Sequence, residues 1–297
     1  MLIGIIKSSR PKQWIKNLMV LFPLLFSFNE SWFIGSIDHA LGLFTGSTLT
    51  ILAFVLASSS IYLINDLADI EQDSRHPMKK KRPVVSGVVG RKTAVVSSLV
   101  LAITGILISS VVAVEISFYI FGYVILMIMY SFVLKNIVLL DVFCISAGFI
   151  IRVVVGAAAI SVPISPWLYV CTGFGSLFVA LSKRVGEISV YGPRESVNRK
   201  VIQKYDGEFG KNLIAMTLTS TLISYCLYTV TASNLPANNS MMLTIPLVVF
   251  GMFRYMYLVT VKGEGEKPEE LVLKDSPLLT CVLGWASLIA AILYFYR

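Results

Sequence analysis

Charged residues are scarce in this sequence, and their scarcity excludes an ordinary soluble protein. Asp, Glu, Lys and Arg make up 14% of the 297 residues, whereas 56% are hydrophobic and the mean hydropathy is +0.78. Average soluble chains carry about 25% charged and about 45–50% apolar residues. The sequence therefore predicts a protein whose surroundings are mostly lipid.

Cysteine and histidine are also few. The four cysteines are widely spaced within apolar runs, without a CxxC or Cys/His ligand spacing, and the two histidines are His39 and His76. These absences argue against a zinc site, a disulfide framework and a histidine-based metal cage. We therefore interpret the cysteines as small buried hydrophobic residues.

Long apolar runs are abundant, and they predict an all-α membrane protein with nine transmembrane helices. A spanning helix needs about 20 mostly apolar residues. Such runs lie near residues 17–35, 40–64, 93–114, 117–134, 137–160, 164–182, 212–232, 242–260 and 277–296. Because we find no internal repeat and no Pro/Gly-rich linker, residues 1–297 are expected to form one domain.

The positive charges predict the orientation of this domain. All but two of the 25 Lys and Arg fall on one set of alternate connections, and the connections near 36–39, 115, 161–163 and 233–241 contain none. Lys and Arg are enriched in cytoplasmic loops. The sequence thus predicts a cell-membrane protein with a cytoplasmic N-terminus, an external C-terminus and two long cytoplasmic loops that carry function, about 65–92 and 183–211.

The first of these loops opens with an acidic motif that contains Asn65, Asp66, Asp69 and Asp73. On a helix the three aspartates fall within an arc of about 60°. Like charges on one helix face repel one another unless a cation lies among them, and oxygen ligands completed by substrate phosphates suit Mg²⁺. The alternative is a solvated helix end with scattered acids, which the apolar run before Asp66 disfavours.

Basic residues follow the acidic motif directly. Arg75 and Arg82 flank the run Lys79, Lys80 and Lys81. Lys and Arg beside a metal site would neutralise the part of a polyanion that the metal does not reach. For the three lysines, attraction to anionic lipid is an equally good explanation.

The second cytoplasmic loop carries another mixed cluster. Its members include Lys183, Arg184, Glu187, Arg199 and Tyr205. The surplus of positive charge again suits an anionic ligand, although Lys183 and Glu187 have the spacing of a plain helical ion pair.

Two charged residues lie inside predicted spans. Asp141 and Arg152 are eleven residues apart and therefore lie on nearly the same helix face. An intramembrane charge usually lines a cavity or meets a partner. Contact with substrate and contact between helices both stay open for this pair.

The acidic motif at the end of the second of nine spans resembles the UbiA superfamily of intramembrane prenyltransferases. The resemblance implies a helical bundle around a cavity open to the cytoplasmic side and to lipid, in which two polar clusters hold Mg²⁺ and a diphosphate. Asn65, Asp66, Asp69 and Asp73 would be the metal ligands, with Asp66 and Asp73 central to catalysis.

Further motifs resemble one branch of this superfamily, which transfers phosphoribose to a polyprenyl phosphate. They are Arg10-Pro11-Lys12-Gln13-Trp14, His76-Pro77 between Arg75 and Arg82-Pro83, and Gly175-Ser176-Leu177-Phe178 before Lys183-Arg184. Most prenyltransferases carry a second aspartate-rich motif where this chain has Lys183 and Arg184. The two cations fit a donor with an extra phosphate.

The resemblance therefore implies Mg²⁺-dependent transfer of 5-phosphoribose from phosphoribosyl diphosphate to a decaprenyl-like phosphate. Lys183, Arg184, Arg199 and Tyr205 would hold the donor's phosphates, and the substrate-binding residues would also include Arg75, Arg82 and Glu187. The lipid phosphate would contact Lys16, Asn17 and Lys135. The alternatives are an ordinary prenyltransferase that uses a prenyl diphosphate and, more remotely, a transporter; no nucleic-acid partner is expected.

Overall fold

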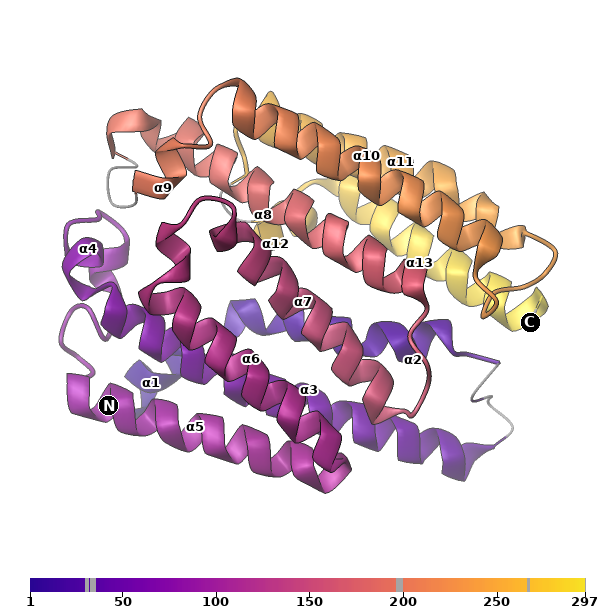
Figure 1. Cartoon of the computed structure of the whole chain (residues 1–297), viewed down its shortest axis with the longest axis horizontal. Helices are drawn as coiled ribbons and strands as arrows, with labels where there is room; N and C mark the ends of the chain where they lie inside the picture. Colours follow the sequence, from indigo (N-terminus) through magenta and orange to yellow (C-terminus); the bar gives the residue numbers. More distant parts are fainter. Residues whose placement is uncertain (30–31, 33–35, 196–199, 266–267, 297) are drawn as a thin grey trace. The chain divides into compact units, whose positions relative to one another are not determined.

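The computed structural model describes residues 1–29, 32, 36–195, 200–265 and 268–296 (Figure 1). Within these ranges every named element is a helix, and the nearest approach to a β-structure is one isolated bridge between Phe28 and Trp32. The predicted all-α class is thus confirmed for the described residues.

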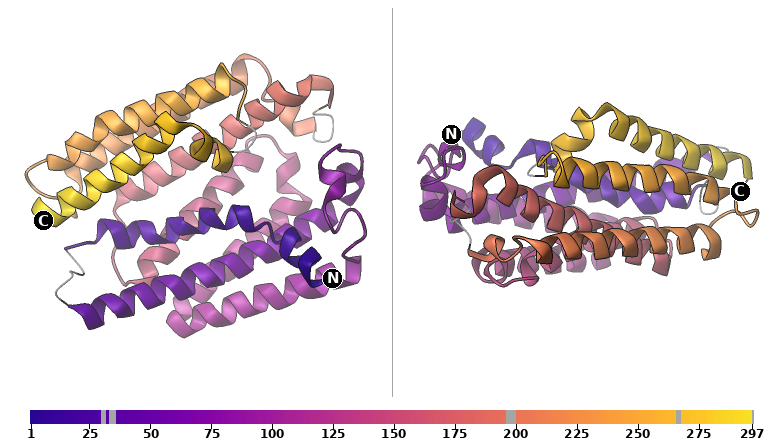
Figure 2. Two further views of the ribbon diagram at one scale, coloured as in Figure 1. Left: turned by 180° about the vertical axis from the view of Figure 1, so that it is seen from behind. Right: turned by 90° about the horizontal axis from the view of Figure 1, so that it is seen from above.

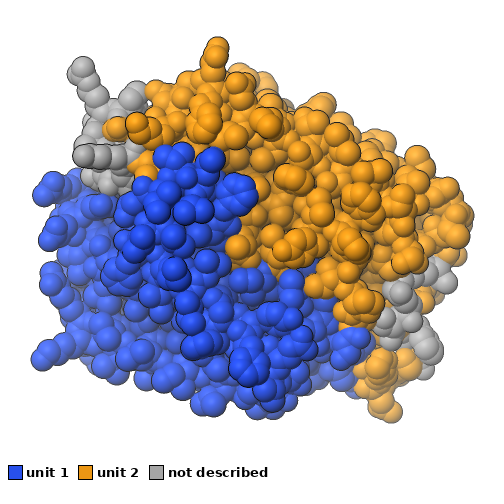
Figure 3. All heavy atoms as spheres, in the orientation of Figure 1, with its two compact units in different colours: residues 1–22, 41–144, 151–161 blue, residues 23–40, 145–150, 162–297 orange. Residues whose placement is uncertain are grey.

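The helices form two compact units whose segments alternate along the chain (Figure 3). Unit 1 comprises residues 1–22, 41–144 and 151–161, and unit 2 comprises residues 23–40, 145–150 and 162–297.

Unit 1 contains the N-terminal elements and most of α3 and α7. Its elements are α1 (Leu2–Ser8), the 3₁₀ helix η1 (Pro11–Leu21), α3 (Ile37–Ala68), α4 (Ile70–Ser74), η2 (Lys79–Lys81), α5 (Arg91–Val112), α6 (Val114–Phe132), η3 (Leu134–Asn136) and α7 (Leu140–Ala159). In this unit α3 runs beside α5, as the left view of Figure 2 shows, and α5 also runs beside α6. Their shared core includes Phe54, Ile116, Ile120 and Tyr123, all buried.

Unit 2 contains most of the C-terminal half. Its elements are α2 (Phe22–Phe26, except its first residue), α8 (Pro166–Glu195), α9 (Lys200–Gln203), α10 (Glu208–Thr231), η5 (Ser240–Thr244), α11 (Ile245–Thr260), α12 (Pro268–Lys274) and α13 (Ser276–Tyr296). Here α8 runs beside α10, and α11 runs beside α13 (Figure 1).

Seven helices in the described part of the chain are long and apolar enough to cross a membrane. They are Ile37–Ala68, Arg91–Val112, Val114–Phe132, Leu140–Ala159, Glu208–Thr231, Ser240–Thr260 and Ser276–Tyr296. Each corresponds to one of the nine predicted spans, within several residues at either end. The chain is therefore a multi-pass membrane protein.

The outer face of α5 shows why these helices need lipid. Leu99, Ile103, Leu107 and Val111 are between 55% and 79% exposed. In water this row would be an aggregation surface, whereas hydrocarbon solvates it.

The other two predicted spans have a different form. Residues 17–35 do not make one continuous helix, because η1 ends at Leu21 and α2 covers only Phe22–Phe26. The second, 164–182, corresponds to α8, which begins at Pro166 as expected but continues to Glu195.

Candidate active site

The acidic motif occupies the junction between α3 and α4. Asp66 lies in the last turn of α3, Asp69 falls on the break between the two helices with a backbone φ of −102°, and Asp73 lies in α4. The break interrupts the single helix on which the sequence placed the three aspartates. All three carboxylates are nevertheless buried, at 1%, 2% and 5% exposure.

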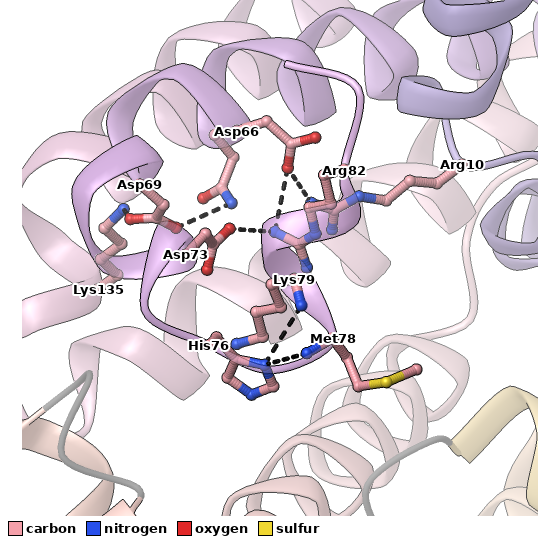
Figure 4. A network of polar contacts seen from close by, with 10 residues as sticks. Arg10, Asp66, Asp69, Asp73, His76, Met78, Lys79, Arg82 and Lys135 are labelled. Carbon is pink, nitrogen blue, oxygen red and sulfur yellow. Dashed lines mark hydrogen bonds and ion pairs between the residues drawn. The ribbon is translucent and has the colours of Figure 1, made fainter. Parts of the chain in front are cut away.

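Basic side chains from three separate segments reach these carboxylates (Figure 4). Arg10 forms an ion pair with Asp66 Oδ1. Arg82 Nη1 bridges two acids, at 3.1 Å from Asp66 Oδ1 and 2.5 Å from Asp73 Oδ2. The cluster therefore combines acids that are close in sequence with cations that are not.

The third aspartate has its own partners. Lys135, in η3, forms a buried ion pair with Asp69 Oδ1. Asn65 donates a hydrogen bond of 3.1 Å to Asp69 Oδ2. We call Asp66, Asp69, Asp73, Arg10, Arg82 and Lys135 the charged cluster; all six belong to unit 1.

The three cations of the charged cluster match its three carboxylates in number. Burial lowers the pKa of the Arg82 guanidinium, and the nearby charge of Arg10 lowers it further, while Asp66 and Asp73 act in the opposite direction. The carboxylates that could bind a divalent cation are thus already paired with basic side chains.

One oxygen in the cluster is free to take a ligand. Asp66 Oδ2 is buried and accepts no hydrogen bond from any described residue. In the described part of the chain no three His, Cys, Asp or Glu side chains converge tightly enough to cage a metal by themselves. Mg²⁺ usually binds through one or two carboxylates and keeps waters or substrate phosphates, so these residues fit that ion.

The loop after the acidic motif is held by a histidine. His76 Nδ1 accepts hydrogen bonds from the backbone N–H groups of Met78 and Lys79, at 3.2 and 3.3 Å (Figure 4). These bonds fold the segment that leads to Arg82. Arg75, which was predicted to bind the donor, is exposed, and within the described residues no hydrogen bond or ion pair joins it to the three aspartates.

The residues predicted to bind the lipid phosphate are in different surroundings. Asn17 is 1% exposed and accepts a hydrogen bond of 2.9 Å from Arg152. Lys135 is held by Asp69. Lys16 is half-buried. Asn17 and Lys135 are thus engaged inside the protein.

The second predicted cluster lies in unit 2. Arg184 is buried and pairs with Glu187 at 3.1 Å, so the helical ion pair uses Arg184 and not Lys183. Lys183 is half-buried. Tyr205 is fully buried and stacks on Phe209 with ring centroids 6.1 Å apart, and Arg199 lies outside the described residues.

Arg10 is the cluster member that our sequence interpretation did not assign to the site. The residue was part of a recognised motif, but nothing in its spacing placed it near Asp66, 56 residues away. Its backbone is left-handed, with φ 51° and ψ 66°. A non-glycine residue in this region is uncommon and merits attention as a functional position.

Known proteins are similar to this chain in sequence and in fold. Residues 21–274 match the UbiA prenyltransferase family. Decaprenyl-phosphate phosphoribosyltransferase from Mycolicibacterium smegmatis is 32% identical over 300 residues, covering 98% of this chain and 93% of the relative. The protein of the same name from Corynebacterium glutamicum is 30% identical over 299 residues, covering 98% and 87%.

A solved structure extends the likeness to three dimensions. A UbiA homolog from Archaeoglobus fulgidus, bound to GPP and Mg²⁺, matches with a TM-score of 0.72 at 16% identity, covering 98% of both chains. At this identity the match shows the shared fold. Together with the family match, it establishes that the chain is a transferase and belongs to the UbiA prenyltransferase family.

Proposed function

We propose that this enzyme transfers 5-phosphoribose from phosphoribosyl diphosphate to a polyprenyl phosphate and releases diphosphate. The observation that carries the proposal is the buried charged cluster, in a chain aligned over 98% of its length with phosphoribosyltransferases of decaprenyl phosphate. Buried carboxylates surrounded by guanidinium and ammonium groups suit a metal-bound diphosphate.

Mg²⁺ would be held by Asp66, through its unpartnered Oδ2, and by Asp69 and Asp73, with Asn65 in support. When bound, the ion would withdraw charge from the diphosphate as it leaves. The solved relative from A. fulgidus is described as bound to Mg²⁺, which supports the choice of metal.

The side chains of the cluster would provide the remaining charge. Arg10 and Arg82 would turn from Asp66 toward the diphosphate oxygens, because a guanidinium binds phosphate through two parallel hydrogen bonds. Lys135 would keep Asp69 oriented. The donor's C1–O bond breaks and its electron pair leaves with the diphosphate, while a lipid phosphate oxygen forms the new bond to C1.

This transfer needs no strong general base. The attacking phosphate is already anionic at neutral pH, so no proton has to be removed from it. His76, the histidine nearest to the cluster, uses Nδ1 to accept backbone hydrogen bonds. Its role is therefore to shape the loop that carries Arg82.

The remaining assignments follow from the phosphoribosyl branch. Lys183 and Arg184, with Arg199, would bind phosphates of the donor, and Lys16 would bind the lipid phosphate. Glu187 would hold Arg184 through their ion pair. Tyr205, buried against Phe209, would support this region through packing.

We further propose that the nine-span topology holds, with a cavity open to the cytoplasmic side and to lipid. The segments 17–35 and 164–182 would be the two spans beyond the seven long apolar helices. The N-terminus and the charged cluster would then face the cytoplasm, as the one-sided distribution of Lys and Arg favours.

A second candidate function is transfer of a prenyl group from a prenyl diphosphate to an aromatic or glycerol-phosphate acceptor. The specific observation in its favour is the fold shared with UbiA homologs bound to GPP and to DMAPP. The identity to these structures is only 15–16%, half of that to the curated phosphoribosyltransferases.

The deciding experiment is donor choice. Purified protein would receive decaprenyl phosphate with phosphoribosyl diphosphate, or prenyl diphosphate with each acceptor class, with and without EDTA. We expect a phosphoribosylated lipid by mass spectrometry and its loss on chelation. Product from the prenyl donor alone would establish the second candidate instead.

A further inference from the structure

Arg152 is a charged residue inside a membrane-spanning helix that the proposed reaction does not use. It lies in the second half of α7 (Leu140–Ala159) and is 5% exposed. A buried charge within a span is costly and is retained where its contacts serve function. The contacts of Arg152 therefore indicate its purpose.

These contacts connect α7 to η1 and α6 within unit 1. Arg152 Nε donates to Asn17 Oδ1 at 2.9 Å, and Nη2 donates to Tyr123 OH at 3.1 Å. The guanidinium also lies over the rings of Tyr123 and Phe54, at 5.0 and 5.3 Å. A planar guanidinium can lie on a ring and donate hydrogen bonds from its edge at the same time, which a lysine ammonium does not reproduce.

The η1 segment needs such external support. It is a 3₁₀ helix of 11 residues, Pro11–Leu21, whereas runs beyond three or four residues are uncommon because their hydrogen-bond geometry is poor. α7 contacts it a second time at Gly156, where a Cβ would lie 2.1 Å from the carbonyl oxygen of Val20. Backbone and side-chain contacts thus fix η1 against α7.

The other end of η1 presents Arg10 to the acidic motif. Arg10 immediately precedes η1, has the left-handed backbone described above, pairs with Asp66 and lies 4.9 Å from the ring of Tyr62. Along η1, Trp14 Nε1 donates to Ser59 Oγ at 3.2 Å, and Asn17 Nδ2 donates to Ser58 Oγ at 3.4 Å. Asn17 therefore contacts both helices that flank η1.

We propose that Arg152 and Asn17 are positioning residues that hold η1 in the register in which Arg10 reaches Asp66. Asn17 links η1 to both helices, because its side chain accepts a hydrogen bond from Arg152 in α7 and donates one to Ser58 in α3. The reaction that would benefit is the proposed phosphoribosyl transfer, and the inference rests on it only for that benefit.

A double-mutant cycle in detergent tests the contact without any substrate. Arg10→Ala alone is expected to lower the melting temperature by a few degrees. In an Asn17→Leu background the same change should have little further effect, because Arg10 has already lost its register. The matched control is Ser98→Ala, which removes the buried Ser60–Ser98 contact of 3.2 Å elsewhere on α3 and should leave the full effect of Arg10→Ala.

Conservative variants protect the test against simple misfolding. Asn17→Asp keeps the oxygen that accepts from Arg152 and loses only the longer bond to Ser58, so it should preserve most of the coupling to Arg10. Arg152→Lys loses the planar guanidinium contacts and should abolish the coupling. Additive effects of Arg10→Ala and Asn17→Leu would overturn the proposal. A full effect of Arg10→Ala on the melting temperature in the Arg152→Lys background would overturn it as well.

Kinetics then separate positioning from a purely structural role. With whichever donor the wild type uses, Asn17→Leu and Arg10→Ala should each raise the donor KM about tenfold, the equivalent of one charged hydrogen bond. The double variant should resemble the single ones. If neither donor reacts with the wild type, the proposed function fails, while the thermal cycle still decides the positioning role.

Discussion

At the scale of single residues, Asp66 is the acid that carries most consequence, because two arginines share one of its oxygens and its other oxygen has no partner among the described residues. Asp66→Asn keeps the shape and removes the charge. We expect a loss of at least about a hundredfold in kcat/KM, since a buried ligand and the partner of two cations are lost together.

The control for this prediction lies one turn further on. Glu71 is an exposed acid in the first turn of α4, so Glu71→Gln removes the same charge without touching the charged cluster. Its activity should stay within about twofold of wild type. A similar loss in both variants would show that the acidic surface as a whole matters, and not the position of Asp66.

The pairing in the cluster also predicts how metal binds. Since Arg10, Arg82 and Lys135 already neutralise the three carboxylates, a divalent cation alone meets competing positive charge. Diphosphate would accept the displaced guanidinium groups, so the two ligands should bind together. Titration with Mn²⁺, followed by electron paramagnetic resonance, is expected to show at least about tenfold tighter binding with inorganic diphosphate present.

Lys80→Ala offers the comparison for this measurement, because Lys80 is exposed and belongs to the basic run but not to the cluster. It should leave the enhancement by diphosphate intact, while Arg82→Ala should reduce it and strengthen Mn²⁺ binding without diphosphate. Equal Mn²⁺ affinity with and without diphosphate in the wild type would contradict the idea that the guanidinium groups leave the carboxylates for diphosphate when the metal binds.

The sequence predicted the acids of this site better than their partners. Asn65, Asp66, Asp69 and Asp73 were visible because they are close in sequence, and Arg82 because it follows nine residues later. Lys135 was assigned to the lipid phosphate, yet it pairs with Asp69, 66 residues away. Such pairings depend on how α3, η1 and η3 pack, and no local pattern encodes that.

At the scale of elements, Gly156 determines how closely η1 approaches α7. Gly156→Ala would place a methyl group 2.1 Å from the Val20 carbonyl oxygen. Backbone would have to move, and overpacking of this kind costs about 1–3 kcal/mol. We expect a lower melting temperature in detergent and reduced activity, because η1 also carries Arg10 to the cluster.

The matched variant is Gly122→Ala in α6, where a Cβ would have no atom within 4 Å. Alanine is the better helix former by up to about 1 kcal/mol, so this variant should be as stable as wild type or more so. Equal destabilisation by both changes would mean that the contact at Val20 is loose.

Hydropathy located the helices but not all of their ends. It predicted seven spans that the structure confirms as long apolar helices. It placed the end of α8 near residue 182, because hydropathy reports where lipid ends, while Lys183, Arg184 and Glu187 are good helix formers and continue the helix to Glu195. In residues 17–35 it marked an apolar run, but it could not predict the 3₁₀ geometry of η1.

At the scale of the whole molecule, the number of spans decides on which side each loop lies. If segment 17–35 and α8 both cross the membrane, residues 7 and 80 lie on one side and residues 161 and 238 on the other. If 17–35 does not cross, only α3 crosses between residues 7 and 80, and these two residues lie on opposite sides. If α8 does not cross, only α10 crosses between residues 161 and 238, and these two residues also lie on opposite sides.

Cysteine labelling distinguishes these arrangements. In a variant without the four native cysteines, Lys7→Cys, Lys80→Cys, Ser161→Cys and Asn238→Cys would each be introduced at an exposed position. With a membrane-impermeant maleimide on right-side-out vesicles, we expect labelling at 161 and 238 and protection at 7 and 80 until detergent is added. If only one of residues 7 and 80 is labelled, segment 17–35 does not cross the membrane. If only one of residues 161 and 238 is labelled, α8 does not cross it. Because the charged cluster follows α3, the same experiment fixes the side from which a water-soluble donor enters.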